Sequence, residues 1–444
     1  MKPARFAHLI LVFLTLAGSA PLLAQETILY NFQGNNVGGS DGIGPNALVA
    51  DAAGNLYGTT ELGGSSQQGV DCCGIIFELS PGAPGQPYTE TVLYHFTGGA
   101  DGAQPSAGLA FDSAGNLYGT AQVGGQFATH YCSLGGCGVV FQLAPPSQSG
   151  GTWTFTTLYA FLGGLDGETP WSNVIFDRAG NLYGTTHDGG NSNGGYGCGV
   201  IYELSPPAHP GGDWTEQVLY RFNGTTRGGA SYAGLVFDKA GALYGTTQSG
   251  GKDYQGVVFR LSPPSKPKGR WRQTVLHRFN AAHSKDGAHP FASLIFDSAG
   301  NLYGTTVQGG TVPDGSGTVF ELSPPSGSGK SWTERLLYSF ACQSDGCQPY
   351  APLTFDAMGN LYGTAFIAGG GFGSPDCGSL GCGSVFKLAP GQAGAWTETT
   401  IHDFSGPDGD HLLSGILIWP DGSLYLSTAG GGPSLDGNVI RIVP

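Results

Sequence analysis

The sequence is poor in basic residues, with 18 Lys and Arg against 32 Asp and Glu and a formal net charge of −14. Because nucleic acid is a polyanion that basic side chains neutralise, this balance argues against a nucleic-acid partner. After the N-terminal segment no apolar run approaches the roughly 20 residues of a membrane helix, so no membrane span is expected in the mature chain. Apolar residues at helical spacing are missing there too, which argues against amphipathic helices.

Residues 1–24 predict a secretory signal peptide. Lys2 and Arg5 form a basic start, Leu9 to Leu16 an apolar core, and Leu22-Leu23-Ala24 a cleavage site. A retained membrane anchor is the alternative, but the apolar core is too short to cross a bilayer comfortably. We therefore expect a secreted protein, extracellular or at the cell surface, that begins near Gln25; periplasmic residence stays open.

Local signatures of catalysis are also lacking. There is no His-Glu-x-x-His and no Gly-x-Ser-x-Gly. Gly329-Lys330-Ser331 imitates the end of a phosphate-binding loop, but Pro324 stands where that loop needs an earlier glycine. The ten histidines form no evident ligand pair. No cofactor and no metal centre are predicted, although a structural cation such as calcium stays open.

The nine cysteines include three pairs with one short spacing: Cys132/Cys137, Cys342/Cys347 and Cys377/Cys382. In an exported protein this pattern predicts local disulfides, because zinc sites usually show tighter pairs with histidine nearby. Cys72 and Cys73 are adjacent and could form only a strained ring, and Cys198 has no obvious partner. One free thiol is expected.

What the sequence does contain is glycine, 79 residues of it, and an internal repeat. A Leu-Tyr core recurs seven times, at intervals of 59 to 65 residues, with its tyrosine at Tyr57, Tyr118, Tyr183, Tyr244, Tyr303, Tyr362 and Tyr425. A fixed period of this kind indicates a repeat architecture, and the seven copies fill the mature chain.

Each copy predicts four short strands. In the second copy they are Ala107–Asp112, Leu117–Ala121, Val139–Leu143 and Trp153–Phe161. The first run is almost continuously apolar, as in a strand covered on both faces, and the third alternates. Asp-x-x-Gly-Asn makes the first hairpin; it resembles part of a calcium loop but lacks the remaining ligands, so a turn is favoured. Gly119, inside the second strand, predicts close approach of an aromatic ring from the next blade.

A four-stranded sheet of this size cannot bury both its faces alone, whereas seven sheets stacked radially can. The expected fold is therefore all-β: one domain, residues 25–444, forming a seven-bladed β-propeller of four-stranded antiparallel blades. A β-helix would need shorter coils, and separate domains would each need a core within about 60 residues. The N-terminal strand 27–32 has no sheet before it, so we predict that it pairs with the last blade, 413–444, and closes the ring.

The recurring Phe-Asp-x-x-Gly-Asn-Leu-Tyr-Gly-Thr, followed by Gly-Gly and Gly-x-Val-Phe-x-Leu, resembles the GloVer tandem-repeat family of bacterial exported proteins. Asp297–Thr306 and Gly317–Leu322 reproduce the pattern in full, and the resemblance covers residues 26–444. It implies export and structural roles for the motif residues, but no reaction. The family is described as having a choice of anchor, and no apolar helix with a basic tail follows the repeats here, so simple secretion is expected.

Several copies depart from the motif. In the fourth copy Ala242 replaces the turn asparagine, and Arg227-Gly228 stands near where other copies have Asp-Gly. The seventh copy, Trp419 to Ser427, loses the Gly-Thr.

Two loop sets are expected on one face of the propeller, the loop entering each first strand and the loop joining the second and third strands. Six entering loops carry Asp-Gly, and sevenfold geometry would arrange the aspartates around one mouth of the channel, where they could bind a cation or a sugar. The simpler interpretation is a turn. These aspartates are Asp41, Asp101, Asp166, Asp286, Asp345 and Asp408.

The second-to-third loops are the longest and least alike, and variable loops on a rigid scaffold commonly carry binding residues. Their candidate ligand-binding residues are His130, His187, Asp188 and Tyr254. We expect a monomeric, non-enzymatic scaffold that binds an extracellular glycan or protein through this face. The alternatives are an extracellular lyase or hydrolase, or a structural envelope component. A perturbed cluster of carboxylates with His or Tyr at the channel mouth would favour the enzyme.

Overall fold

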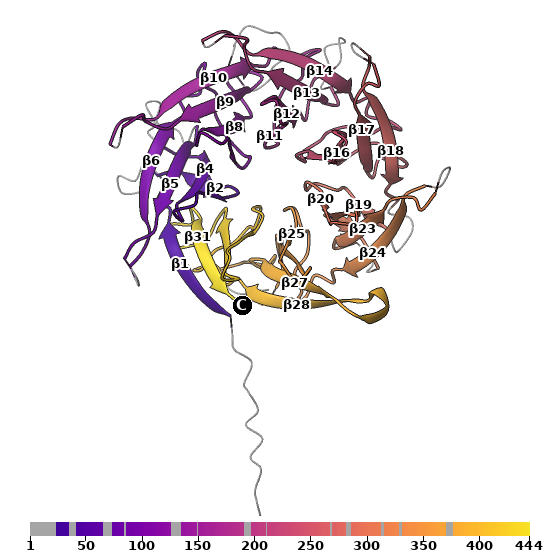
Figure 1. Cartoon of the computed structure of the whole chain (residues 1–444). Coiled ribbons are helices and arrows are strands. Elements are labelled where there is room, and N and C mark those ends of the chain that lie inside the picture. The colour runs from indigo at the N-terminus through magenta and orange to yellow at the C-terminus, as the bar shows by residue number, and fades with distance from the viewer. Residues whose placement is uncertain are drawn as a thin grey trace, which may run out of the picture.

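The computed structural model describes residues 24–34, 41–64, 73–83, 86–125, 135–148, 150–190, 197–209, 211–266, 269–280, 286–311, 315–327, 331–369 and 376–444. Within these ranges the chain forms seven small antiparallel sheets set radially around one axis (Figure 1). The predicted all-β, seven-bladed propeller is thus confirmed. Of the predicted signal peptide, only residue 24 lies in the described part. No helix there is long and apolar enough to cross a membrane.

Blades are numbered in chain order, and the strands of each blade run from the axis outward. Blade 1 has β3 (Val49–Ala50), β4 (Leu56–Leu62), β5 (Ile75–Ser80) and β6 (Thr89–His95), with β2 (Ile43–Pro45) added beside β4. Blade 2 has β7 (Ala110–Phe111), β8 (Leu117–Ala121), β9 (Val139–Ala144) and β10 (Thr154–Ala160). Blade 3 has β11 (Ile175–Phe176), β12 (Leu182–Thr185), β13 (Val200–Ser205) and β14 (Thr215–Arg221). Blade 4 has β15 (Val236–Phe237), β16 (Leu243–Thr247), β17 (Val257–Ser262) and β18 (Arg272–Arg278).

The remaining blades repeat this order. Blade 5 has β20 (Ile295–Phe296), β21 (Leu302–Thr306), β23 (Thr318–Ser323) and β24 (Thr333–Ser339), and a separate pair β19 (Gly287–Ala288) and β22 (Gln308–Gly309). Blade 6 has β25 (Thr354–Phe355), β26 (Leu361–Ala365), β27 (Ser384–Pro390) and β28 (Trp396–Asp403), with the 3-10 turn η2 (Gln392–Gly394) before β28. Blade 7 has β29 (Leu417–Ile418), β30 (Leu424–Thr428), β31 (Asn438–Val443) and, outermost, β1 (Gln25–Asn31).

The predicted strands of the second copy agree with blade 2 except for the innermost one. Only Ala110 and Phe111 of the predicted 107–112 run pair with β8. The residues before them line the channel, as described below, and take no part in the ladder. The first strand is therefore shorter than its apolar run suggested.

The Asp-x-x-Gly-Asn-Leu-Tyr motif is a self-contained hairpin. The carboxylate of Asp112 accepts hydrogen bonds from the backbone N–H of Ala114 (2.8 Å) and Asn116 (3.0 Å), from the Asn116 amide (2.7 Å) and from the Tyr118 hydroxyl (3.1 Å). These four donors already engage the carboxylate, so the geometry favours the turn over a calcium loop.

The fourth copy keeps this turn without its asparagine. The backbone N–H of Ala242 still donates to the carboxylate of Asp238 (2.9 Å). The guanidinium of Arg260 donates to the same carboxylate (3.4 Å), in place of the missing asparagine amide. A charged donor from the third strand thus compensates for the lost side chain.

The motif glycine in the second strand is required by a side chain of its own blade. A Cβ on Gly119 would lie 2.6 Å from Cζ of Phe141, the residue opposite it on β9. The prediction of a ring from the next blade was therefore wrong: the side chains of paired residues on adjacent strands share one face of the sheet, and Phe141 leans over the vacant position. The same arrangement recurs at Gly58 with Phe77 and at Gly363 with Phe386.

The hydrophobic core lies between blades. One cluster joins Tyr57 and Ile76 of blade 1 to Leu117 and Phe141 of blade 2, and six further clusters link the other adjacent pairs. Each sheet therefore obtains its shielding from its neighbours, as radial stacking requires.

The ring closes through the N-terminal strand. β1 pairs antiparallel with β31, from Gln25 opposite Val443 to Asn31 opposite Asn438, and the two strands lie side by side in Figure 1. Leu29 and Phe32, 6% and 1% exposed, pack in the cluster that joins blade 7 to blade 1. The predicted pairing of this segment with the last blade is confirmed.

Candidate ligand-binding site at the channel mouth

The loop entering each blade and the loop between its second and third strands do share one face. In every blade a short antiparallel bridge joins the two, and the bridged residues are Ile43–Leu62, Ala103–Val123, Glu168–Asp188, Gly229–Ser249, Gly287–Gly309, Cys347–Ile367 and Asp410–Gly430. These bridges fix the direction in which the chain turns inward toward the axis.

In six of the seven blades the motif threonine, or the serine that replaces it, holds the inward-turning segment of the next blade. The hydroxyl of Thr305 in blade 5 has no hydrogen-bond partner among the described residues. The hydroxyl of Thr120 donates to the backbone carbonyl of Ser172 (3.0 Å), and Thr185 donates likewise to Ala233 (2.9 Å). Ser427, which replaces the threonine in the seventh copy, donates to the backbone carbonyl of Asn46 (2.7 Å) and so links blade 7 to blade 1. The Gly-Thr of the repeat thus sets the position of the residues that line the channel.

One position of this segment differs strongly between copies while its surroundings repeat. It precedes the first strand and lines the channel in blades 2 to 7, as Ser106, Trp171, Tyr232, Phe291, Tyr350 and Leu413. In blade 1 the channel is lined by Asn46, which stands one position nearer to the motif tyrosine. Blades 3 to 6 therefore present four consecutive aromatic side chains. We call Trp171, Tyr232, Phe291 and Tyr350 the aromatic arc.

The rings of the aromatic arc contact one another in sequence. Trp171 and Tyr232 meet edge to face with centroids 5.2 Å apart, Tyr232 and Phe291 are stacked at 4.2 Å, and Phe291 and Tyr350 meet edge to face at 5.0 Å. Such pairs stabilise each other by about 0.5–1.5 kcal/mol beyond their buried area, so the arc is preorganised. All four rings stay partly exposed.

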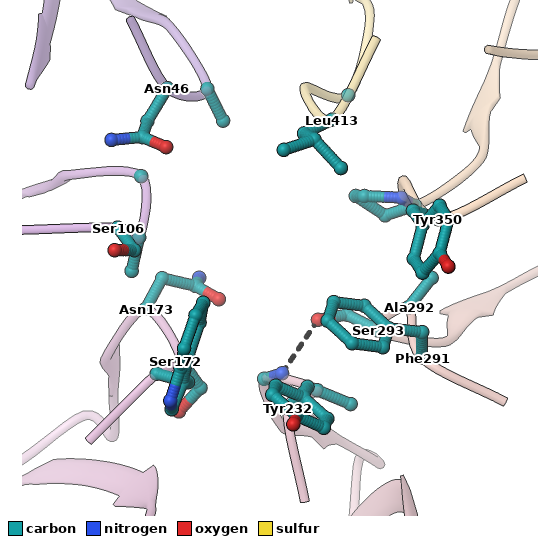
Figure 2. A pocket seen from close by; sticks show the side chains of 18 of the residues that line it. Asn46, Ser106, Ser172, Asn173, Tyr232, Phe291, Ala292, Ser293, Tyr350 and Leu413 are labelled. Carbon is teal, nitrogen blue, oxygen red and sulfur yellow. Dashed lines mark hydrogen bonds between the residues drawn. The ribbon is translucent and has the colours of Figure 1, made fainter. Parts of the chain in front are cut away.

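These rings border a cavity of about 330 Å³ at the centre of the propeller. In Figure 2 the labelled rings of Tyr232, Phe291 and Tyr350 follow one side, and Asn46 and Ser106 lie across from them. The volume is at the lower end of the roughly 300–1,000 Å³ typical of small-molecule sites. An apolar wall facing a few polar groups is the usual composition of such sites.

The polar side of the cavity contains one carboxylate, that of Glu61 on β4. Burial raises the pKa of Glu61. No described residue donates a hydrogen bond to this carboxylate or forms an ion pair with it. Of the described residues that line the cavity, Glu61 is the only charged one.

The six predicted aspartates lie elsewhere. None is among the described cavity-lining residues. In each case the carboxylate accepts a hydrogen bond from a Tyr or His of the preceding blade's outer strand, at 2.7 to 3.1 Å, and another from a backbone N–H at the start of the loop. The donors are Tyr30 for Asp41, Tyr94 for Asp101, Tyr159 for Asp166, His277 for Asp286, Tyr338 for Asp345 and His402 for Asp408. This geometry favours a loop-fixing role.

The copy that lacks the aspartate supports this interpretation. The hydroxyl of Tyr220 donates to the side-chain oxygen of Gln273 (3.0 Å), whose amide donates in turn to the carbonyl of Arg227 (2.7 Å). A glutamine from the next outer strand thus replaces the missing carboxylate as the acceptor.

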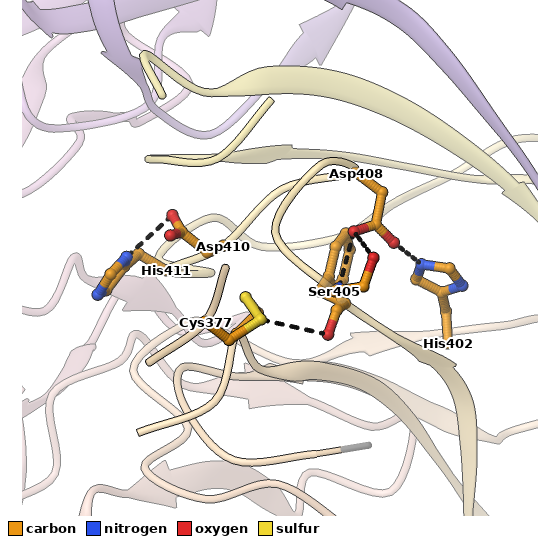
Figure 3. Close-up of a disulfide and its surroundings, with 8 residues drawn as sticks. Cys377, His402, Ser405, Asp408, Asp410 and His411 are labelled. Carbon is orange, nitrogen blue, oxygen red and sulfur yellow. Dashed lines mark hydrogen bonds and ion pairs between the residues drawn. A yellow bond between two sulfur atoms is a disulfide. The ribbon is translucent and has the colours of Figure 1, made fainter. Parts of the chain in front are cut away.

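One of these aspartates, Asp408, also belongs to a group of side chains close enough together to hold a metal ion. The ligand atoms of Glu26, His402 and Asp408 lie within 4.8 Å of one another. Figure 3 shows His402 and Ser405 bonded to Asp408. His402 donates to Asp408 as tyrosine does in most other copies, so the cluster has a structural explanation in the repeat.

The predicted loop residues are placed differently. His130 lies outside the described residues, and Tyr254 is 64% exposed, away from the cavity. His187 bonds Asp188 (Nδ1 to Oδ2, 2.8 Å), and its ring lies 4.3 Å from that of Tyr232 in the aromatic arc. Of the four predicted loop residues, His187 and Asp188 therefore come close to the cavity.

Two of the three predicted disulfides, Cys342–Cys347 and Cys377–Cys382, are confirmed. Cys137 is disulfide-bonded, and its predicted partner Cys132 lies outside the described residues; Cys73 is disulfide-bonded as well. Cys198 is a free thiol, as expected.

The aromatic arc and Glu61 were missed at the sequence level. Their signal was present, because aligning the copies on Leu-Tyr isolates one position that is aromatic in four consecutive copies. The residues that the copies share, which the sequence makes conspicuous, are the structural ones.

Fold and site together define a seven-bladed β-propeller with a ligand-sized cavity at its axis. The model of the Gloeobacter/Verrucomicrobia repeat matches residues 18–206 and 192–375, and the chain belongs to this repeat family. No curated protein matches the sequence. Among solved structures, a protein of Thermus thermophilus with the provisional name oxidoreductase (glucose dehydrogenase) is similar at 18% identity and a TM-score of 0.41, over 76% of this chain and 96% of that one.

Proposed function

We propose that this protein is an exported, non-enzymatic binding scaffold whose ligand is a carbohydrate held at the aromatic arc. The observation that carries the proposal is the row of four partly exposed rings on one wall of the cavity, opposite amide, hydroxyl and carboxylate groups. Sugar rings have apolar C–H faces and hydroxyl edges. Aromatic rings suit those faces, and the polar groups suit those edges.

Export through the signal peptide at residues 1–24 is part of the proposal. It is supported by the two disulfides, which persist in oxidising compartments, and by membership of the repeat family. We further propose that the protein is a monomer. A protein ligand at the same face is the alternative partner.

The test is a glycan array with the purified mature chain, followed by calorimetry and turnover assays on every glycan that binds. Phe291→Ala should weaken binding about two- to tenfold, since a stacked ring contributes about 0.5–1.5 kcal/mol beyond its buried area. Tyr254→Ala is the matched control, because this exposed aromatic lies outside the cavity. Binding that Phe291→Ala leaves unchanged, or cleavage of a bound glycan, would overturn the proposal.

A second candidate function, an enzyme acting on an extracellular polymer, is favoured by one cluster. Burial, followed by the nearby Asp188 and Asp166, raises the pKa of Glu168 to about 7, within range of a general acid. His187 bonds Asp188 and contacts the ring of Tyr232. Product formation that is lost in Glu168→Gln with binding intact would support this function.

A further inference from the structure

We propose that the cavity selects an amine-bearing sugar, in its protonated form, over neutral and acidic sugars. The inference rests on the proposed function and specifies its ligand class.

The first argument is the unpaired charge of Glu61. Glu61 is half-buried, and a carboxylate that loses part of its water is destabilised unless a cation or hydrogen-bond donor compensates it. The described part of the chain supplies neither to Glu61. Because this side chain lines the cavity, the compensating group has room to come from a ligand.

The second argument is the absence of basic side chains from the described lining of the cavity. A uronic acid, a sulfate ester or a phosphate would enter beside Glu61 without any cation to pair with. Like charges in a poorly solvated site repel, so these ligands are disfavoured.

The third argument is the aromatic arc itself. Blade 1, which carries Glu61, lies across the ring from blades 4 and 5, which carry Tyr232 and Phe291 (Figure 1). The faces of aromatic rings attract cations as well as C–H groups. A protonated amino sugar therefore satisfies both walls at once: its ammonium pairs with Glu61, and its ring face packs on the arc.

The test compares three ligands that share one backbone, the β-1,4-linked trimers of glucosamine, N-acetylglucosamine and glucose. Calorimetry is run from mildly acidic to neutral pH, because the amine must be protonated while Glu61, whose pKa is raised by burial, must keep its charge. At the pH where both are charged, the glucosamine trimer should bind about tenfold tighter than the glucose trimer, as expected for a hydrogen bond between charged groups. The preference should weaken as salt is raised.

The variant Glu61→Gln keeps the shape and removes the charge. It should abolish the preference for the glucosamine trimer while changing the affinity for the glucose trimer less than about twofold. Glu78→Gln, on β5 of the same blade and outside the cavity lining, should change neither. Melting curves of all variants establish that they are folded.

Three trimers of equal affinity in the wild type, or a preference that survives in Glu61→Gln, would overturn the inference. If these trimers bind equally and Phe291→Ala weakens their binding, the carbohydrate proposal stands and the charge selection fails. If no glycan on the array binds, both fail.

Discussion

The paired glycine and phenylalanine in the middle of the blade make a quantitative prediction. In blade 2 a Cβ added to Gly119 would lie 2.6 Å from Cζ of Phe141 and 3.0 Å from Cδ2 of Leu109, whereas ordinary contacts are 3.4–4 Å. The ring is fully buried and packs against Phe96 and Phe155, both with centroids 5.3 Å away, so it cannot move aside freely. Gly119→Ala should therefore lower the free energy of unfolding by about 1–3 kcal/mol.

A double mutant separates this clash from other effects of the substitution. Phe141→Leu alone should be destabilising because it leaves a cavity, but in Gly119→Ala/Phe141→Leu the added methyl group occupies part of that space. Blade 7 uses such a combination naturally, with Leu426 paired with Ile440. Thermal unfolding should show the double mutant to be more stable than the sum of the single effects. Gly327→Ala, where a Cβ meets nothing within 4 Å, is the control. Additive losses would refute the explanation.

Three further predictions concern closure, pH and cations. Phe32→Ala empties a fully buried site where the end of β1 packs against blade 1, and it should lower the free energy of unfolding by about 3–5 kcal/mol. Ile28→Ala, at a position of β1 that is 37% exposed, should lower it by less than about 1 kcal/mol. Equal melting temperatures of the two variants would contradict ring closure by β1. Burial raises the pKa of four glutamates to about 7: Glu90, Glu168, Glu216 and Glu334. The folded state therefore binds more protons than the unfolded state between pH 4.5 and 7, and the melting temperature should fall as pH rises through that window. Glu216→Gln should reduce this dependence of the melting temperature on pH, and a melting temperature that rises with pH would contradict the raised pKa values. Adding a chelator should leave the melting temperature unchanged because the six loop aspartates already accept protein hydrogen bonds, and a fall would instead indicate a bound cation at these loops or at Glu26, His402 and Asp408.

The architecture was predictable because it depends on what the copies share. Tyr118 recurs in every copy since its ring packs against the next blade, at Phe176 with centroids 4.9 Å apart, and its hydroxyl fixes the hairpin through Asp112. Closure was predictable from the unpaired strand at the start. The ring that lies over Gly119 was not predictable. A glycine inside a strand indicates that another side chain approaches closely, but it does not tell which strand carries that side chain.

The candidate site was harder to predict for the opposite reason. The loop aspartates recur, and recurrence in a repeat protein reflects the packing of repeats, here the bond from a tyrosine such as Tyr338 to Asp345. The aromatic arc and Glu61 differ from copy to copy, and only the closed ring brings them to one cavity. The sequence tells which blade carries each residue, but only the folded structure shows that Glu61 and the aromatic arc face one cavity.

The most direct test of the account is a crystal structure of the mature chain with the tightest-binding glycan. We predict that the sugar lies in the central cavity, with a ring face on Tyr232 or Phe291 and a donor group at the Glu61 carboxylate. A glycan bound on the outer surface of the blades, with the cavity empty, would contradict it.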